Sequence, residues 1–120
     1  IVYLGTTKGA YDFTRIINEF KNLITKKNNL YLSIITKDDS KILLSKLKEY
    51  KIPEKFFKII SLNGNDLIKE LSDNDVAFFY LNENYSVKAS FPTKIAEFLS
   101  LGIPLVCNNF NDDIFYYIKK

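Results

Sequence analysis

The chain has 120 residues, of which 47% are hydrophobic and 26% charged, so its composition argues for one folded globular domain and against a disordered or collagen-like protein. Its net charge of +3 comes from 17 basic and 14 acidic residues scattered along the sequence. Nucleic-acid binding usually needs basic residues gathered on one face, so no nucleic-acid partner is expected. The absence of histidine excludes imidazole catalysis and histidine-ligated metals within these residues, and no metal is expected.

The cysteine content and the apolar pattern also bear on location. Cys107, the single cysteine, ends a predicted apolar strand, where a buried thiol fits a reducing compartment. No run approaches the ~20 apolar residues of a membrane span, and no signal peptide is recognisable. We therefore expect a cytoplasmic location, or a peripheral one at the cytoplasmic face of a membrane. Because the chain begins without methionine inside a predicted strand, we expect residues 1–120 to be one domain of a longer protein.

The first half of the chain alternates short apolar runs with amphipathic segments. Residues 1–4 are predicted to form a buried strand that ends at Gly5. Residues 10–25 carry apolar side chains at helical spacing and predict a helix. A second strand is expected over residues 30–35 and a second helix over residues 40–50.

The same alternation continues after the turn at Pro53. A third strand is predicted over residues 56–61, followed by a helix over residues 66–71 with Asn65 as its N-cap. Residues 76–81 are continuously apolar, which is typical of a strand buried on both faces. A long connection over residues 82–91 then leads into the last part of the pattern.

A short helix with clear start and stop signals comes next. Pro92 can begin this helix because the first helical N–H has no partner there. Gly102 can end it in a left-handed conformation, and Pro104 prevents its continuation. The predicted buried face consists of Ile95, Phe98 and Leu99. A fifth strand is expected over residues 105–107, and residues 114–120 begin another helix.

Short apolar strands that alternate with amphipathic helices predict an α/β fold, specifically a Rossmann-like doubly wound three-layer αβα sandwich with a parallel sheet of about five strands. In the commonest strand order the sheet reverses direction between the first and fourth strands, and ligands bind outside their carboxyl ends. Those ends carry residues 5–9 and residues 82–94. The topology therefore predicts that these two stretches meet.

The glycine-bounded loop over residues 5–9 is the first candidate ligand site. Its backbone N–H groups, two hydroxyls and the Lys8 ammonium could bind phosphate oxygens. It matches neither the P-loop nor the dinucleotide fingerprint, which argues against an ATPase or a dehydrogenase. The alternative is a tight strand-to-helix turn with a solvated lysine.

The helix that begins near Pro92 is the second candidate. Ser90 and Thr93 could line its start or simply cap it. Lys94 and Glu97 could bind a ligand, or form a surface ion pair worth a few tenths of a kcal/mol.

These residues resemble a known family. The segment from Ser90 to Val106, SFPTKIAEFLSLGIPLV, resembles the donor-site segment of glycosyltransferase family 4 and its GT-B relatives, which carries a Pro-x-Lys-x-x-Glu-Tyr/Phe-x-x-x-Gly-x-Pro pattern. Residues 2–5 and the following helix are similar to the start of that family's C-terminal domain. Residues 71–77 resemble its lead into the fourth strand. The resemblance implies the nucleotide-sugar-binding half of a two-domain GT-B enzyme.

The resemblance also assigns roles residue by residue. It implies that Glu97 accepts hydrogen bonds from the ribose hydroxyls of the donor, while Lys94 faces the diphosphate or the sugar. It implies that residues 61–66 flank the nucleobase. The implied donor-binding residues are Gly5, Thr6, Lys8, Ser90, Phe91, Pro92, Thr93, Lys94 and Glu97. Ala89 stands where many members have a glutamate that contacts the donor sugar.

The implied function is transfer of a hexose from a nucleoside-diphosphate sugar to a saccharide or lipid-linked acceptor, in polysaccharide or glycoconjugate synthesis. The acceptor and any general base would belong to an N-terminal domain outside these residues, so no catalytic residue is assigned here. No cofactor besides the donor is implied. Two alternatives remain: a GT-B nucleotide-sugar epimerase, for which a histidine would be expected, and a non-catalytic Rossmann-like binding or regulatory module.

Overall fold

A parallel five-stranded sheet forms the centre of the protein. The computed structural model describes residues 1–5, 7, 13–79, 98 and 100–107. The strands are β1 (Val2–Leu4), β2 (Leu32–Ile35), β3 (Phe57–Ile60), β4 (Ala77–Phe79) and β5 (Leu105–Cys107). Their order across the sheet is β3-β2-β1-β4-β5, and every neighbouring pair is parallel. The predicted reversal between the first and fourth strands is thus confirmed.

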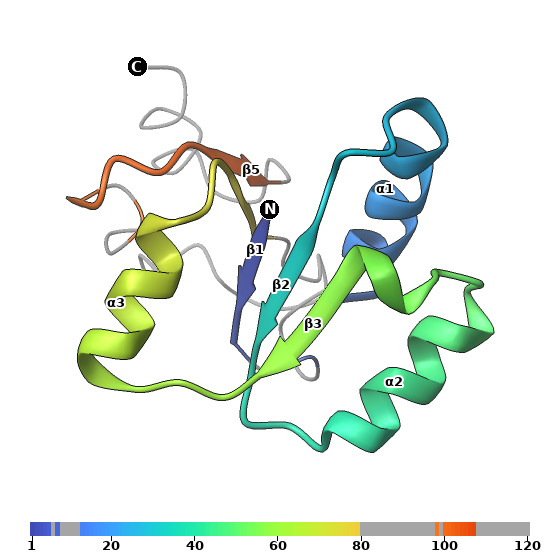
Figure 1. Ribbon diagram of the computed structural model, residues 1–120, viewed down its shortest axis with the longest axis horizontal. Helices are drawn as coiled ribbons and strands as arrows, with labels where there is room; N and C mark the ends of the chain where they lie inside the picture. Colours follow the sequence, from blue (N-terminus) through green and yellow to red (C-terminus); the bar gives the residue numbers. More distant parts are fainter. Residues whose placement is uncertain (6, 8–12, 80–97, 99, 108–120) are drawn as a thin grey trace, which may run out of the picture.

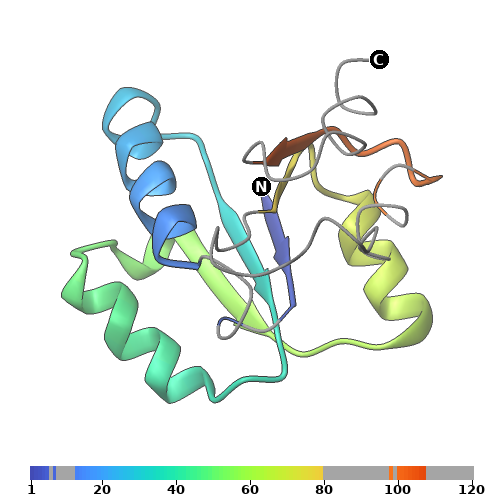
Figure 2. The same ribbon diagram turned by 180° about the vertical axis from the view of Figure 1, so that it is seen from behind.

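Helices cover both faces of this sheet. They are α1 (Phe13–Lys26), α2 (Ser40–Glu49) and α3 (Gly64–Ser72), and a short 3₁₀ helix, η1 (Glu54–Phe56), precedes β3. α1 and α2 lie on one side of the sheet and α3 on the other (Figures 1 and 2). The fold is therefore the predicted Rossmann-like α/β sandwich.

The larger part of the core lies beneath α1 and α2. Because side chains alternate along a strand, Tyr3, Ile34 and Phe78 reach this face from three neighbouring strands. α1 contributes a fully buried stripe at helical spacing, as its sequence predicts. That stripe consists of Phe13, Ile16, Ile17 and Phe20.

A smaller apolar cluster fills the space on the α3 face. Val2, Ala77 and Leu105 supply it from three adjacent strands, and Leu71 supplies it from α3. Phe98, one of the predicted buried residues, is fully buried in the same cluster. Ile95 and Leu99, predicted to share that face, lie outside the described residues.

The same left-handed turn occurs twice in the described chain. In the turn that follows Phe98, Gly102 has φ of 73°, and the Ile103 N–H donates to the Phe98 carbonyl at 2.9 Å, as the sequence predicts. At the end of α2 the corresponding residue is Lys51, with φ of 61°. There the Ile52 N–H donates to the Leu47 carbonyl at 3.1 Å. The second turn therefore places a residue with a Cβ where glycine is favoured.

The start of α3 corrects a prediction. Asn65 is not the N-cap, because the helix begins at Gly64 and Asn63 occupies the cap position. The Asn63 side chain makes no capping hydrogen bond; its carbonyl accepts the first helical bond from the Leu67 N–H at 3.3 Å. Gly64, with φ of 57°, makes the change of chain direction one residue earlier than the sequence suggested.

Candidate functional site at the carboxyl edge of the sheet

The carboxyl ends of β1, β2 and β3 are joined to one another by backbone hydrogen bonds. The Gly5 N–H donates to the Ile35 carbonyl at 3.0 Å, and the Thr36 N–H donates to the Ile60 carbonyl at 2.9 Å. Gly5 has φ of 134°, a conformation that side chains with a Cβ rarely adopt. The first connection therefore leaves the sheet in a direction that depends on glycine.

A side-chain network continues from these strand ends. The Thr7 N–H and the Thr7 hydroxyl both donate to Oδ2 of Asp38, each at 2.7 Å. The Asp38 N–H in turn donates to Oγ1 of Thr36 at 3.1 Å, and Thr36 is buried. This network links the connection after β1 to the connection after β2.

The sequence analysis did not select Asp38. The residue stands 31 positions after Thr7, so no local motif contains the pair. A signal was nevertheless present: hydroxyl donors follow the first predicted strand, and a pair of acids, Asp38 and Asp39, follows the second. Since these strands are neighbours in a parallel sheet, donors and acceptors at their carboxyl ends can meet. Asp39 has a different task, because its Oδ1 accepts from the Lys41 N–H and caps α2.

Among the predicted donor-binding residues, only Gly5 belongs to the described part of the chain. It directly follows β1, the strand that pairs with β4 where the strand order reverses. The others lie outside the described residues and are Thr6, Lys8, Ser90, Phe91, Pro92, Thr93, Lys94 and Glu97. The predicted base-flanking stretch leads from β3 into α3, so it follows an outer strand of the sheet.

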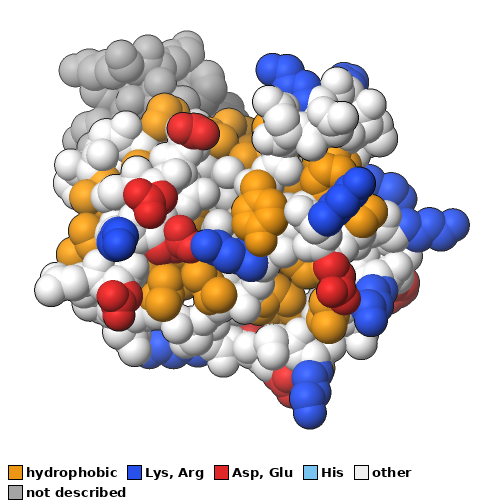
Figure 3. All heavy atoms as spheres, in the orientation of Figure 1, with side chains coloured by type: hydrophobic (Ala, Val, Ile, Leu, Met, Phe, Trp, Pro, Cys, Tyr) orange, Lys and Arg blue, Asp and Glu red, His pale blue; other side chains and the backbone are white. Residues whose placement is uncertain are grey.

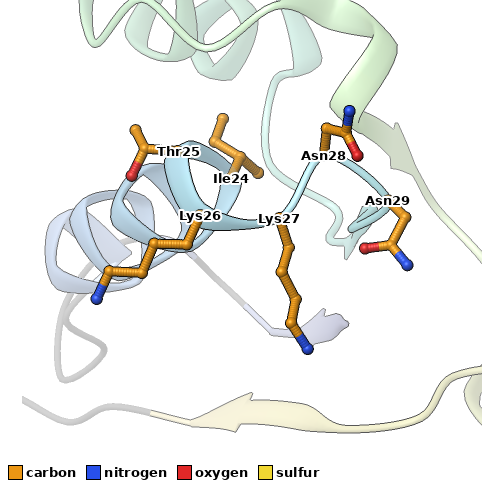
Figure 4. A pocket seen from close by; sticks show the side chains of 6 residues that line it. All are labelled: Ile24, Thr25, Lys26, Lys27, Asn28 and Asn29. Carbon is orange, nitrogen blue, oxygen red and sulfur yellow. The ribbon is translucent and has the colours of Figure 1, made fainter.

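Two described hollows lie elsewhere. One, of about 560 Å³, is lined by residues 24–29 at the end of α1 (Figure 4). Its six side chains come from one continuous stretch, and Lys26 and Lys27 extend in different directions rather than toward a common point (Figure 4). A second hollow, of about 450 Å³, lies at the amino edge and includes the ion pair of Lys58 with Glu70.

Charges of both signs are spread over the face that Figure 3 shows, among the residues that the structure describes. On the described part of the face in Figure 3, basic and acidic side chains alternate with hydrophobic ones. No group of three or more acidic or cysteine side chains suited to a metal ion occurs among the residues that the structure describes. None of the helices in this part of the chain is both long and apolar enough to cross a membrane.

The strand order and the covered faces define the class of the protein: a Rossmann-like α/β fold whose switch point lies between β1 and β4. Comparisons with known protein families, with curated proteins and with solved structures found no match. The fold class is therefore established by the structure itself, and the function is argued from the residues.

Proposed function

We propose that this chain is the nucleotide-sugar-binding half of a glycosyltransferase that moves a sugar from a nucleoside-diphosphate sugar to a saccharide or glycoconjugate acceptor. The observation that carries the proposal is the pairing of β1 with β4. Parallel neighbours end at the same edge of a sheet, and ligands of open α/β sheets bind at such a reversal. The loop that starts at Gly5 follows β1, and the segment with Lys94 and Glu97 follows β4 in the sequence.

The end of the second segment supports the same assignment. The family pattern closes with Gly-x-Pro, which in this chain is Gly102 and Pro104. Gly102 has the left-handed conformation expected of the glycine, and β5 follows directly, paired to β4. The segment with the candidate ligand residues is thus joined at both ends to strands of the sheet.

The chemistry that we propose needs no metal. Backbone N–H groups and the Lys94 ammonium would stabilise the negative charge that develops on the departing nucleoside diphosphate. Glu97 would accept hydrogen bonds from the ribose hydroxyls, which fixes the nucleotide relative to the diphosphate contacts. The acceptor and any general base would come from another domain of the enzyme.

The test is a titration of the chain with UDP, GDP and their hexose derivatives, followed by amide NMR. We expect shifts at residues 5–8 and 90–97. The variant Glu97→Ala should bind at least about tenfold more weakly, because each lost hydrogen bond between a charged group and a ligand hydroxyl costs roughly 1.5–3 kcal/mol. Glu49→Ala, which removes the same charge from an exposed position on α2, is the matched control and should bind normally.

Two results would contradict the proposal. One is the absence of any shift at millimolar nucleotide. The other is a set of shifts confined to other surfaces, such as the hollow around residues 24–29. Normal binding by Glu97→Ala would support the reading in which Lys94 and Glu97 form only a structural ion pair.

A further inference from the structure

Asp38 uses one carboxylate oxygen for two hydrogen bonds to a single residue. Both the N–H and the hydroxyl of Thr7 donate to Oδ2 at 2.7 Å. Bonds to an ionised acceptor are shorter and stronger than bonds between neutral groups. The pair is partly buried, so water competes for these donors less than at an exposed site.

Asp38 is itself held in place by the sheet. Its N–H donates to Oγ1 of Thr36, which is only 6% exposed and whose own N–H bonds to the end of β3. The position of the carboxylate is therefore fixed from β2 and β3. The residue that it holds, Thr7, lies in the loop bounded by Gly5 and Gly9.

The contact at Thr7 restricts the connection that begins at Gly5. Glycine loses more conformational freedom on folding than any other residue, and Gly5 has φ of 134° at the point where the loop leaves β1. A loop that must present backbone N–H groups to an anion binds more tightly when it is already ordered, because ordering no longer opposes binding.

We propose that Asp38 is a positioning residue, which by holding Thr7 orders the connection after β1 for the diphosphate of the nucleotide. This inference rests on the proposed function, since Gly5, Thr6 and Lys8 in the same loop are among the proposed donor-binding residues. In this role Asp38 acts through Thr7 and does not touch the ligand. Its charge opposes that of the diphosphate, so its benefit to binding comes from geometry and not from attraction.

This opposition allows geometry and charge to be separated. Because a single oxygen accepts both bonds, the side-chain amide oxygen that Asp38→Asn introduces can accept both as well. Asp38→Asn therefore keeps an acceptor for both Thr7 donors and removes the repulsive charge. Asp38→Ala removes both, and its loss of charge alone would favour an anion.

The experiment measures the affinity of the chain for UDP together with hydrogen exchange of the Thr7 amide. In Asp38→Ala we expect roughly tenfold weaker UDP binding and at least about tenfold faster Thr7 exchange, in line with the loss of two hydrogen bonds. Asp38→Asn should bind UDP within about threefold of the original chain, or more tightly. If only the charge of Asp38 mattered, the two variants would bind UDP equally well, because both lack that charge.

Matched controls keep the test specific. Asp39→Ala removes the same charge one residue away and deletes the cap of α2, but leaves Thr7 untouched. It should lower stability and leave both UDP affinity and Thr7 exchange within about twofold of normal. If Asp38→Ala does not fold, Thr7→Val against Thr7→Ser provides the same comparison, because only the serine keeps the hydroxyl donor.

The outcomes distinguish this inference from the proposed function. Normal UDP binding by Asp38→Ala, or binding by Asp38→Asn as weak as that of Asp38→Ala, would overturn the role of Asp38 and leave the proposed function standing. Failure of the unaltered chain to bind UDP and GDP overturns the proposed function, and the diphosphate role of Asp38 falls with it. An unchanged rate of Thr7 amide exchange in Asp38→Ala would contradict the proposal that Asp38 holds Thr7, whatever the affinity of that variant for UDP.

Discussion

At the carboxyl edge of the sheet Asp38 joins the connections that follow β1 and β2, whereas at the amino edge Lys58 of β3 pairs with Glu70 of α3. The amino edge also has the two hollows described above, which would attract attention on size alone. The ion pair at this edge connects β3 to α3, so it contributes to the packing of the helix on the sheet. The Asp38 contact connects two loops that each leave the sheet, at the edge where Rossmann-like folds bind ligands. For the proposed function, the position of polar contacts in the topology is therefore a better guide than the volume of a hollow.

The largest expected effect concerns the core between the two edges. Phe98 is fully buried in the cluster on the α3 face and supplies the carbonyl that closes the turn at Gly102. Phe98→Ala should lower the free energy of unfolding by about 3–5 kcal/mol, because it leaves a cavity beneath the sheet. Urea unfolding measures the change. Leu101→Ala, at a partly exposed site in the same turn, is the control and should cost less than about 1 kcal/mol. Equal losses of stability in the two variants would show that burial of Phe98 does not stabilise the fold more than the exposed Leu101 does.

A smaller effect is expected at the amino edge. The Glu70 side chain is 14% exposed and that of Lys58 39%, so Glu70→Gln should lower stability by about 0.5–1 kcal/mol. The loss should shrink in about 1 M salt, which screens the pair. UDP affinity should not change, because the site lies at the opposite edge from Gly5. A Glu70→Gln variant with weakened UDP binding would break the proposed division between the edges.

The smallest expected effect is a gain in stability. Lys51 follows α2 with φ of 61°, a conformation that costs less for glycine. Lys51→Gly should raise the free energy of unfolding by about 0.5–1 kcal/mol, the relief of strain exceeding the added freedom of the unfolded chain. Lys48→Gly, within the same helix, should act in the opposite direction by about 1 kcal/mol. Both changes should leave nucleotide binding unaltered, and thermal or urea unfolding distinguishes the two signs.

Most of the fold could be predicted because the spacing of apolar residues and the backbone angles of glycine are properties of short stretches of sequence. The apolar spacing of α1 and the run of apolar residues in β2 identify buried faces directly. The turn at Gly102 was predictable because glycine is the residue that tolerates its backbone angles. The turn at Lys51 was not, because the sequence has no glycine there to indicate it. Asn65 was chosen as a cap from its type, although Gly64 had already allowed the helix to begin.

The candidate site was harder to predict than the fold. The position of Gly5 at the reversal followed from strand order, which the sequence analysis inferred correctly. The contact between Thr7 and Asp38 depends on register between strands that are far apart in sequence, and no spacing rule encodes it. The remaining donor-binding residues, from Thr6 to Glu97, stay predictions.

The strand order also has a consequence for the order in which the protein assembles. β1, β2 and β3 lie in one continuous stretch of sequence and pair with their neighbours in succession, so loop closure opposes their association least. β4 must then pair with β1, from which it is separated in sequence by all of the elements from α1 to α3. The pairing of Val2 with Ala77 shows this separation. Until it does, β1 has an unpaired backbone edge. During synthesis this edge is where we expect another chain to pair wrongly, and where a chaperone would be of most use.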